Sequence, residues 1–145
     1  MATERTAHVT WSGDLMSGSG TIDDTGTGAL GQLPVSWPAR AESQQEGKTS
    51  PEELIAAAHA ACFSMALSHA LAQAGNAPEQ LSARATVTFV PGTGITKSVL
   101  EVEGRVPGLD EDAFREAAEN AKANCPVSKA LSGNVELELR AGLAT

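Results

Sequence analysis

The stretch S-P-E-E-L-I-A-A-A-H-A-A-C-F-S-M-A-L-S, residues 50–68, decides the fold because it opens a long apolar helix. Ser50 is suited to cap that helix, Pro51 to occupy its first position, and Glu53 to complete a Ser-x-x-Glu capping box. We expect the helix to cover residues 51–74, with a glycine directly after it. Another backbone could approach it closely where side-chain bulk is low, at Ala56, Ala57, Ala58, Ala60 and Ala61.

The residues before this helix are rich in glycine, serine, threonine and proline. Short β-type runs at Ala7–Trp11 and Leu33–Trp37 predict two strands, and the glycines between them predict hairpins and loops. The polar stretch Glu42–Thr49 is expected to be an exposed loop.

The residues after the helix alternate between strand and helix patterns. Val87–Phe89 and Val99–Val106 have strand composition, and a helix is expected from Asp110 to about Asn124. A short helix is expected to begin at Pro126 and to end before Gly133. Val135–Arg140 alternates between apolar and polar residues and predicts a half-buried strand. This order of elements predicts an α+β fold.

The composition is that of one domain. The chain has 145 residues and no internal repeat or linker, so residues 1–145 are expected to form a single domain. Hydrophobic residues make up 41% of the chain, but only 3% are aromatic and none is tyrosine. Small side chains bury little area each, so we expect oligomerisation to help bury the alanine-rich helix.

Charge and hydropathy exclude several functions. The formal net charge is −8, and the ten lysines and arginines form no cluster, which argues against binding to nucleic acid. No run of 18 purely apolar residues is present, so a membrane span is not expected. The first residues, M-A-T-E-R-T-A-H-V-T-W-S-G-D, do not form a secretory signal, and we expect a cytoplasmic protein.

Cys62 and Cys125 are the two cysteines, 63 positions apart (125 minus 62), so the chain has no C-x-x-C motif. Cys62 lies about three turns inside the predicted helix, where a buried core cysteine is the plainer interpretation. A reactive thiolate there would need an outside cation, for which Arg40 is the best candidate nearby in sequence. Cys125 precedes Pro126 at the start of a short helix, where exposed N–H groups favour a thiolate, although it could also simply fill a turn.

Glu52 has no capping role of its own, unlike Glu53. If the helix is continuous, Glu52 and Cys62 are about 15 Å apart along its axis and cannot share a site within one subunit. A site that used both would need a break in the helix or a second subunit.

Metal and dinucleotide sites are both poorly supported. His59 is one turn from Cys62, but His69 is about 10 Å further along the helix and no fourth ligand is evident. Residues 26–31 match G-x-G-x-x-G, yet no apolar strand precedes them and Pro34 follows where a helix should run. We therefore expect neither a metal nor another cofactor.

Two long motifs resemble a known family. Residues 50–68 resemble the nucleophile helix of the OsmC/Ohr peroxidases, and N-C-P-V-S-K-A-L at 124–131 resembles the segment with their second cysteine. W-S-G-D-L near the start and the glycine-rich residues near 18–30 also resemble the OsmC branch. The resemblance covers nearly the whole chain, in order.

The resemblance implies an intertwined α+β homodimer with its active sites at the subunit interface. It implies that Cys62 is the peroxidatic cysteine, that Cys125 is the resolving cysteine, and that Arg40 and Glu52 are the other catalytic residues. The implied activity is the reduction of organic hydroperoxides in antioxidant defence, with an external dithiol of the lipoyl or thioredoxin type as reductant. Apolar neighbours such as Phe63, Met65 and Leu67 would favour alkyl hydroperoxides over hydrogen peroxide.

Two positions depart from the family pattern. Ala41 stands where an aromatic residue commonly follows the arginine, which makes Arg5 a fallback for Arg40; Ser50 replaces the usual asparagine and is a sound cap. Three alternatives to an enzyme of this kind stay open: a non-enzymatic thiol sensor or small-ligand binder on the same fold, a structural dimer module with inert cysteines, and a thiol–disulfide exchanger of proteins.

Overall fold

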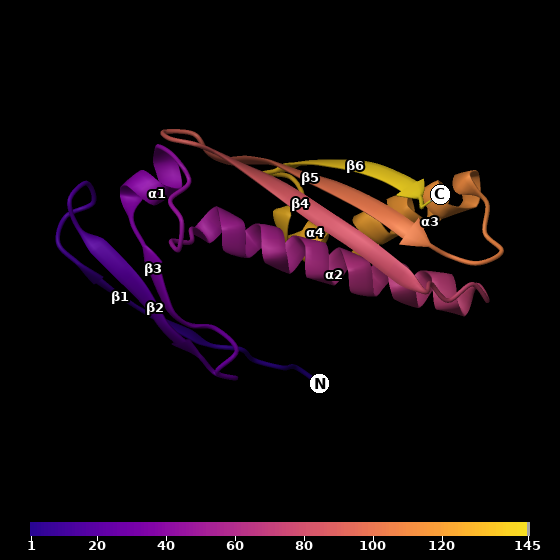
Figure 1. Ribbon diagram of the computed structural model, residues 1–145, viewed down its shortest axis with the longest axis horizontal. Coiled ribbons are helices and arrows are strands. Elements are labelled where there is room, and N and C mark those ends of the chain that lie inside the picture. Colours follow the sequence, from indigo (N-terminus) through magenta and orange to yellow (C-terminus); the bar gives the residue numbers. More distant parts are fainter. Residues whose placement is uncertain (145) are drawn as a thin grey trace. The chain divides into compact units, whose positions relative to one another are not determined.

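The computed structural model describes residues 1–144 (Figure 1). Contacts group the chain into two compact units, Met1–Leu54 and Ile55–Thr145, which are described separately. The prediction of a single domain stays a prediction.

The first unit is built on an antiparallel sheet in the order β1, β2, β3. Strand β1 covers Ala7–Ser12, β2 covers Ser19–Thr25 and β3 covers Gly31–Val35. The predicted strand at Ala7–Trp11 is confirmed. Strand β2 was not predicted, because its polar sequence S-G-T-I-D-D-T buries only alternate small or apolar side chains.

The predicted strand Leu33–Trp37 is wrong at its end. Strand β3 stops at Val35, and helix α1, Trp37–Ala41, begins two residues later. The Ser36 hydroxyl accepts a hydrogen bond from the Ala39 N–H at 3.3 Å, and a proline lies in the first turn. Serine followed by an early proline is a helix-start signal that outweighs the β propensity of the flanking valine and tryptophan.

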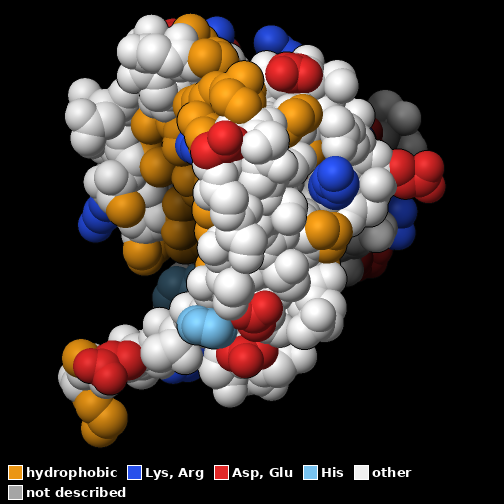
Figure 2. Space-filling model, turned by 90° about the vertical axis from the view of Figure 1, so that its left-hand side faces the viewer, with side chains coloured by type: hydrophobic (Ala, Val, Ile, Leu, Met, Phe, Trp, Pro, Cys, Tyr) orange, Lys and Arg blue, Asp and Glu red, His pale blue; other side chains and the backbone are white. Residues whose placement is uncertain are grey.

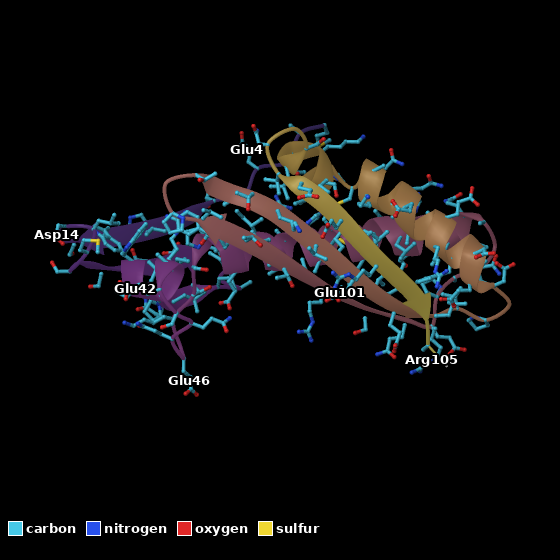
Figure 3. The ribbon with its side chains drawn as sticks, turned by 90° about the horizontal axis from the view of Figure 1, so that it is seen from above. Glu4, Asp14, Glu42, Glu46, Glu101 and Arg105 are labelled. Carbon is cyan, nitrogen blue, oxygen red and sulfur yellow. The ribbon has the colours of Figure 1, made fainter. Side chains whose placement is uncertain are left out.

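The polar loop after α1 is exposed from Glu42 to Lys48, as predicted, except at the half-buried Gln45, and Glu46 points away from the chain in Figure 3. Thr49 is the exception, because it is buried. Its N–H donates to the Pro34 carbonyl at 3.0 Å, and it forms a parallel bridge with Val35. This bridge holds the end of the loop against β3.

Helix α2 covers Pro51–Gln73 without interruption. The Ser50 hydroxyl accepts from the Glu53 N–H at 3.1 Å, which is one half of the predicted capping box. The Glu53 carboxylate instead accepts from the Thr49 hydroxyl at 2.7 Å. Gly75 follows the helix with φ +89°, a left-handed conformation that favours glycine after a helix end.

The second unit contains a sheet in the order β4, β5, β6. Strands β4, Gln80–Val90, and β5, Gly94–Arg105, are antiparallel, whereas β5 and β6, Glu136–Leu143, are parallel. Parallel neighbours need a crossover, and helices α3, Glu111–Asn124, and α4, Pro126–Leu131, supply it (Figure 1). The predicted elements after the central helix are confirmed, and all three strands are longer than predicted; the fold class is α+β.

The core of this unit lies between the sheet and its helices. Helix α2 contributes Phe63, Leu67 and Leu71, which are at most 2% exposed, and each such side chain stabilises the fold by about 1.5–3 kcal/mol. Phe114 of α3 packs over Gly104 of β5, where an added Cβ would lie 2.6 Å from the ring. Glycine at that position therefore allows α3 to approach the sheet.

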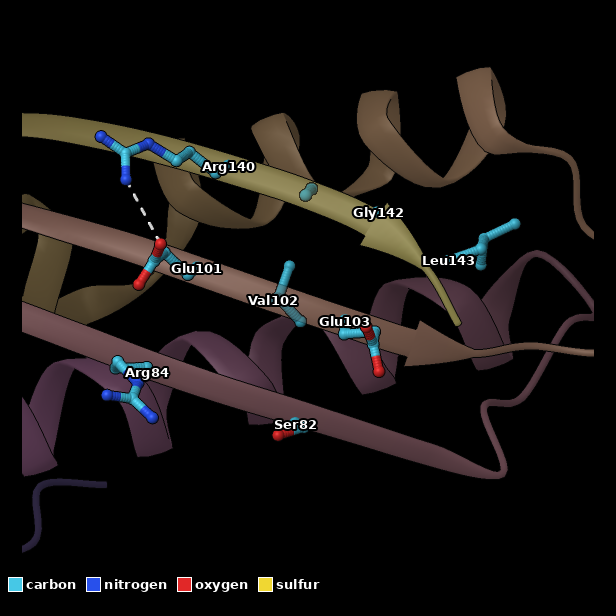
Figure 4. Close-up of a pocket in the computed structure, with 9 residues that line it drawn as sticks. Ser82, Arg84, Glu101, Val102, Glu103, Arg140, Gly142 and Leu143 are labelled. Atoms are coloured by element: carbon cyan, nitrogen blue, oxygen red, sulfur yellow. Dashed lines mark hydrogen bonds and ion pairs between the residues drawn. The ribbon is translucent and has the colours of Figure 1, made fainter. Parts of the chain in front are cut away.

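The outer face of the same sheet is polar. Arg140 and Glu101 form an ion pair at 3.3 Å across β5 and β6, beside Arg84 on β4, and these side chains line a shallow pocket (Figure 4). Exposed ion pairs of this kind contribute little to stability. The face is the solvated side of the sheet.

Figure 2 shows hydrophobic side chains at the surface, with only scattered lysines and arginines on the face in view. The large exposed hydrophobic residues include Val9 and Trp11 of β1 and Met65 of α2. Helix α2 is long and apolar enough by composition to cross a membrane, a test that the core helix of a soluble protein also passes. Its residues Phe63, Leu67 and Leu71 are core residues of the second unit.

Candidate active site

The structure brings Cys62 and Cys125 together. Cys62 lies in the middle of α2, and Cys125 lies between α3 and α4 as the residue that caps α4. Both are free thiols, and their side chains hydrogen-bond to each other. Spacing alone could not predict this contact, because the strands β4 and β5 and helix α3 separate the two residues in sequence.

The surroundings of Cys125 favour its thiolate. Burial by itself raises the pKa of Cys125, but the hydrogen bond from the Cys62 thiol and the polar groups at the start of α4 outweigh it, and the pKa is lowered. These groups are the Ser128 N–H, the Ser128 hydroxyl and the Val127 N–H. A lowered pKa is the direction that a helix start is expected to give a cysteine.

The surroundings of Cys62 act in the opposite direction. Burial raises the pKa of Cys62, and donation of its S–H to Cys125 raises it further, as does repulsion by the Cys125 charge. The Val127 N–H lowers it, but less strongly. Since the two thiols interact, they titrate as a pair, and the directions of the two pKa shifts favour the charge on Cys125 over the charge on Cys62.

Solvent exposure also differs between the two cysteines, and it favours Cys62 as the residue that reacts with an oxidant. Cys125 is 0% exposed, whereas Cys62 is partly exposed. A small oxidant would therefore reach the Cys62 sulfur first. Of the apolar neighbours expected to favour alkyl hydroperoxides, Phe63 and Leu67 are 0% exposed and belong to the core, whereas Met65 is 72% exposed.

His59 is a site residue that the sequence did not reveal in this role. Its ring is 0% exposed, with Nδ1 2.7 Å from the Ser98 hydroxyl and Nε2 2.8 Å from the Ser128 hydroxyl. Burial lowers its pKa, which favours the neutral ring. Because Ser128 also hydrogen-bonds to Cys125, a chain of polar side chains leads from β5 through α2 and α4 to both cysteines. Ser128, in the C-P-V-S sequence that begins with Cys125, was the one signal in the sequence for a polar partner beside this cysteine.

Arg40 and Glu52 form an ion pair in the first unit. The Arg40 Nε donates to both carboxylate oxygens of Glu52, at 3.0 and 3.2 Å, and Nη2 donates to Oε1 at 2.8 Å. Glu52 is 6% exposed, and the arginine side chain is 31% exposed. Helix α1 supplies the arginine and the first turn of α2 supplies the acid. Arg5, the fallback, is exposed and donates to the Glu4 carbonyl at 2.7 Å.

Glu52 and Cys62 lie on the same uninterrupted helix, α2. The helix break that would let both act within one subunit is therefore absent. No group of three or more histidine, cysteine or acidic side chains suited to a metal ion occurs within residues 1–144. Both ring nitrogens of His59 are instead bonded to serine hydroxyls.

Comparisons with known proteins show the family to which the chain belongs. Residues 43–140 match the family described as OsmC-like protein. The chain is 44% identical over 131 residues to Peroxiredoxin OsmC of Escherichia coli (strain K12), covering 88% of this chain and 90% of that protein. It is 34% identical over 92 residues to an organic hydroperoxide resistance protein of Xanthomonas axonopodis pv. citri (strain 306), covering 63% and 65% of the two chains.

Solved structures have the same fold. The organic hydroperoxide resistance protein OhrB of Bacillus subtilis matches with a TM-score of 0.66 at 29% identity, covering 94% of this chain and 97% of that one. An OsmC-like protein from Mycoplasma pneumoniae matches with a TM-score of 0.72 at 16% identity over the whole of both chains, which is a likeness of fold. On the family match and the identity over most of its length, this chain belongs to the OsmC-like protein family.

Proposed function

We propose that this chain is a thiol-dependent peroxidase that reduces organic hydroperoxides, with Cys62 as the reacting thiol and Cys125 as the resolving one. The observation that carries the proposal is the contact between two free thiols, one partly exposed and one buried at a helix start. The names of the relatives, peroxiredoxin and organic hydroperoxide resistance protein, support a peroxidase role.

The reaction needs only the two thiols and an external reductant. The Cys62 thiolate attacks the terminal oxygen of the hydroperoxide, the O–O bond breaks, and the leaving alkoxide takes up a proton to become an alcohol. Cys62 is thereby oxidised to a sulfenic acid. The Cys125 thiolate then attacks the Cys62 sulfur, a S–S bond forms, and the released hydroxide becomes water. An external dithiol of the lipoyl or thioredoxin type restores both thiols by exchange.

Acidity is the obstacle to the first step, because the surroundings within the second unit raise the pKa of Cys62 and lower that of Cys125. A positive charge near Cys62 would move the shared proton toward Cys125. We assign that role to Arg40, whose orientation Glu52 fixes through three hydrogen bonds. Arginine suits it because its charge is permanent and its fork can bind a carboxylate and still face another anion.

A homodimer is part of the proposal. Residues on one side of α2 are exposed although they are mostly apolar, namely Ala57, Ala58, Ala61, Met65 and Ala72. All six residues of β1 are also exposed. A second copy that covers these surfaces would let Glu52 and Arg40 act in the partner's site, and sedimentation velocity would detect it. We expect the protein to act in the cytoplasm.

Steady-state turnover of cumene hydroperoxide with dithiothreitol or dihydrolipoamide tests the function. Wild-type protein should turn over, and Cys62→Ser should not. No turnover by a wild-type protein with a reduced, accessible Cys62 would favour a thiol sensor or ligand binder. For substrate class, kcat/KM should be higher for cumene hydroperoxide than for hydrogen peroxide, and the reverse order would remove the organic preference.

A further inference from the structure

The buried polar side chains around Cys125 form one connected chain. His59 lies between two serines, with Nδ1 2.7 Å from Ser98 and Nε2 2.8 Å from Ser128, and all three residues are at most 1% exposed. Ser128 also hydrogen-bonds to Cys125, which hydrogen-bonds to Cys62. Helix α2, strand β5 and helix α4 each supply one member of the His–Ser–Ser group.

A core needs no imidazole for packing alone. Burying a polar group costs free energy unless its hydrogen bonds are made, and the His59 ring is 0% exposed. The two serines satisfy both ring nitrogens. A purely structural role for His59 would need only these two hydrogen bonds. Here the hydrogen-bonded chain continues from Ser128 to the sulfur of Cys125, the proposed resolving cysteine.

The direction of the hydrogen bonds decides what the chain does. A neutral imidazole has one donor and one acceptor nitrogen. If Nε2–H donates to the Ser128 oxygen, the hydroxyl hydrogen of Ser128 is free to donate to the Cys125 thiolate. If Nε2 accepts instead, the Ser128 hydroxyl donates its hydrogen to the ring. Its oxygen can then only accept a hydrogen bond from the Cys125 thiol. The tautomer of His59 is therefore linked to the proton on Cys125.

We propose that His59 is a positioning residue for disulfide formation, which donates to Ser128 so that the Ser128 hydroxyl donates to the Cys125 sulfur. The proposal rests on the proposed function, because the step is attack of the Cys125 thiolate on the sulfenic sulfur of Cys62. In that step the S–S bond forms, the S–O bond breaks and hydroxide leaves to become water.

Within the second unit few other groups can titrate against Cys125, and the proposed dimer would add only the paired Arg40 and Glu52 of the second copy. Cys62 faces it from α2, and His59 reaches it through Ser128; β5 contributes the Ser98 hydroxyl behind the ring. The neighbouring charged side chains on α4 and α3 are Lys129, which is exposed, and Lys122, which pairs with Glu119 at 3.1 Å. A change in Cys125 acidity on altering His59 would therefore report on this chain of hydrogen bonds.

The test compares His59→Gln with His59→Asn. A glutamine amide N–H can take the place of Nε2–H and still donate to Ser128, whereas asparagine reaches only toward Ser98. In the Cys62→Ser background Cys125 is the one thiol, and the ultraviolet absorbance of its thiolate can be titrated without interference because the chain has no tyrosine. The titration needs neither a peroxide nor solvent access to the sulfur.

His59→Gln should keep the Cys125 pKa. His59→Asn should raise it by at most about one unit, because Ser128 then donates to Cys125 without the ring N–H that orients its hydroxyl. Ser128→Ala removes the donor itself and should give the full rise of about one unit, and it keeps the proposal testable if a His59 variant does not fold. An unchanged titration in folded His59→Asn or in Ser128→Ala, or an equal rise in His59→Gln, would overturn the proposal.

With Cys62 restored, the rate of disulfide formation after one equivalent of cumene hydroperoxide should distinguish the same variants. His59→Gln should keep the wild-type rate, and His59→Asn should change it. For a one-unit rise, His59→Asn should be about threefold slower at low pH and about threefold faster at high pH, since a more basic thiolate is scarcer but more nucleophilic. If the rate of disulfide formation had the same pH dependence in His59→Asn as in the wild type, the positioning role would be overturned. A normal titration with no oxidation by peroxide would instead refute the proposed peroxidase function.

Discussion

Cys62 lies in the middle of a 23-residue helix, whereas Cys125 lies at the start of a six-residue one, and the two positions give the same side chain opposite properties. Mid-helix N–H groups are used within the helix, so Cys62 finds few donors and its pKa is raised by burial and by Cys125. The first N–H groups of α4 and the Ser128 hydroxyl lower the pKa of Cys125. Exposure runs the other way. A peroxidatic cysteine needs both solvent access and a lowered pKa. In this pair the accessible thiol, Cys62, is the less acidic one, so each cysteine meets one of the two requirements.

The largest effect is expected from removal of the buried thiol. Cys125→Ser should react once with hydroperoxide and then lose turnover, because no thiol is left to form the disulfide and Cys62 advances to sulfinic acid. Steady-state assays with dithiothreitol and the mass of the Cys62 peptide check both parts. Full sustained turnover in this variant would show that Cys125 does not resolve the intermediate.

Removal of the proposed cation should have the next largest effect. Arg40→Ala should raise the pKa of Cys62 by about one to three units, the range for loss of a nearby opposite charge. The pH dependence of Cys62 alkylation measures it, with Arg40→Lys as a control that keeps the charge but not the fork. An alkylation profile identical to the wild type would assign the cation's role to another residue.

Glu52→Gln should act in the same direction but more weakly. The amide keeps one acceptor for Arg40 and loses the charge that holds it, so the Cys62 pKa should rise by less than about one unit. Glu53→Gln is the matched control, because Glu53 is the next residue along the helix and its carboxylate accepts from the Thr49 hydroxyl and not from an arginine. Equal shifts in both variants would point to a general effect of charge at the start of α2.

The smallest effect concerns stability in acid. Burial lowers the pKa of His59 below its ordinary value of 6.5, so the unfolded chain binds a proton more readily than the folded one. The free energy of unfolding should therefore fall as the pH drops below about 6.5, by at most about 1.4 kcal/mol per pH unit from this group. His59→Gln should remove that slope in urea denaturation, and His69→Gln, at an exposed position of the same helix, should keep it. A slope unchanged by His59→Gln would contradict the buried neutral ring.

Local signals in the sequence predicted the elements that depend on local interactions. Ser50, Pro51 and Gly75 mark the ends of α2, and Asp110 caps α3 through the Ala113 N–H at 2.8 Å. The end of β3 was missed because the composition of residues 33–37 was read as a strand throughout. Strand β2 was missed because pairing with both neighbours, and not its own composition, makes it a strand.

The site was predictable in its residues but not in its contacts. The motifs around Cys62 and Cys125 identified both thiols, and the positions of Arg40 and Glu52 were chosen by resemblance. Nothing in a separation of 63 positions (125 minus 62) indicates that two sulfurs meet. His59 was weighed only as a metal ligand, because the serines that fill its hydrogen-bonding capacity come from β5 and α4, 39 and 69 positions away.

The central claim is that the accessible thiol is oxidised first and the buried one closes the disulfide. Treating reduced wild-type protein with one equivalent of cumene hydroperoxide and mapping the products by mass spectrometry tests it most directly. The account predicts a Cys62–Cys125 disulfide within one chain, with the sulfenic acid trapped on Cys62 when the reaction is stopped early. Unmodified thiols, or a sulfenic acid on Cys125 with Cys62 still reduced, would contradict it.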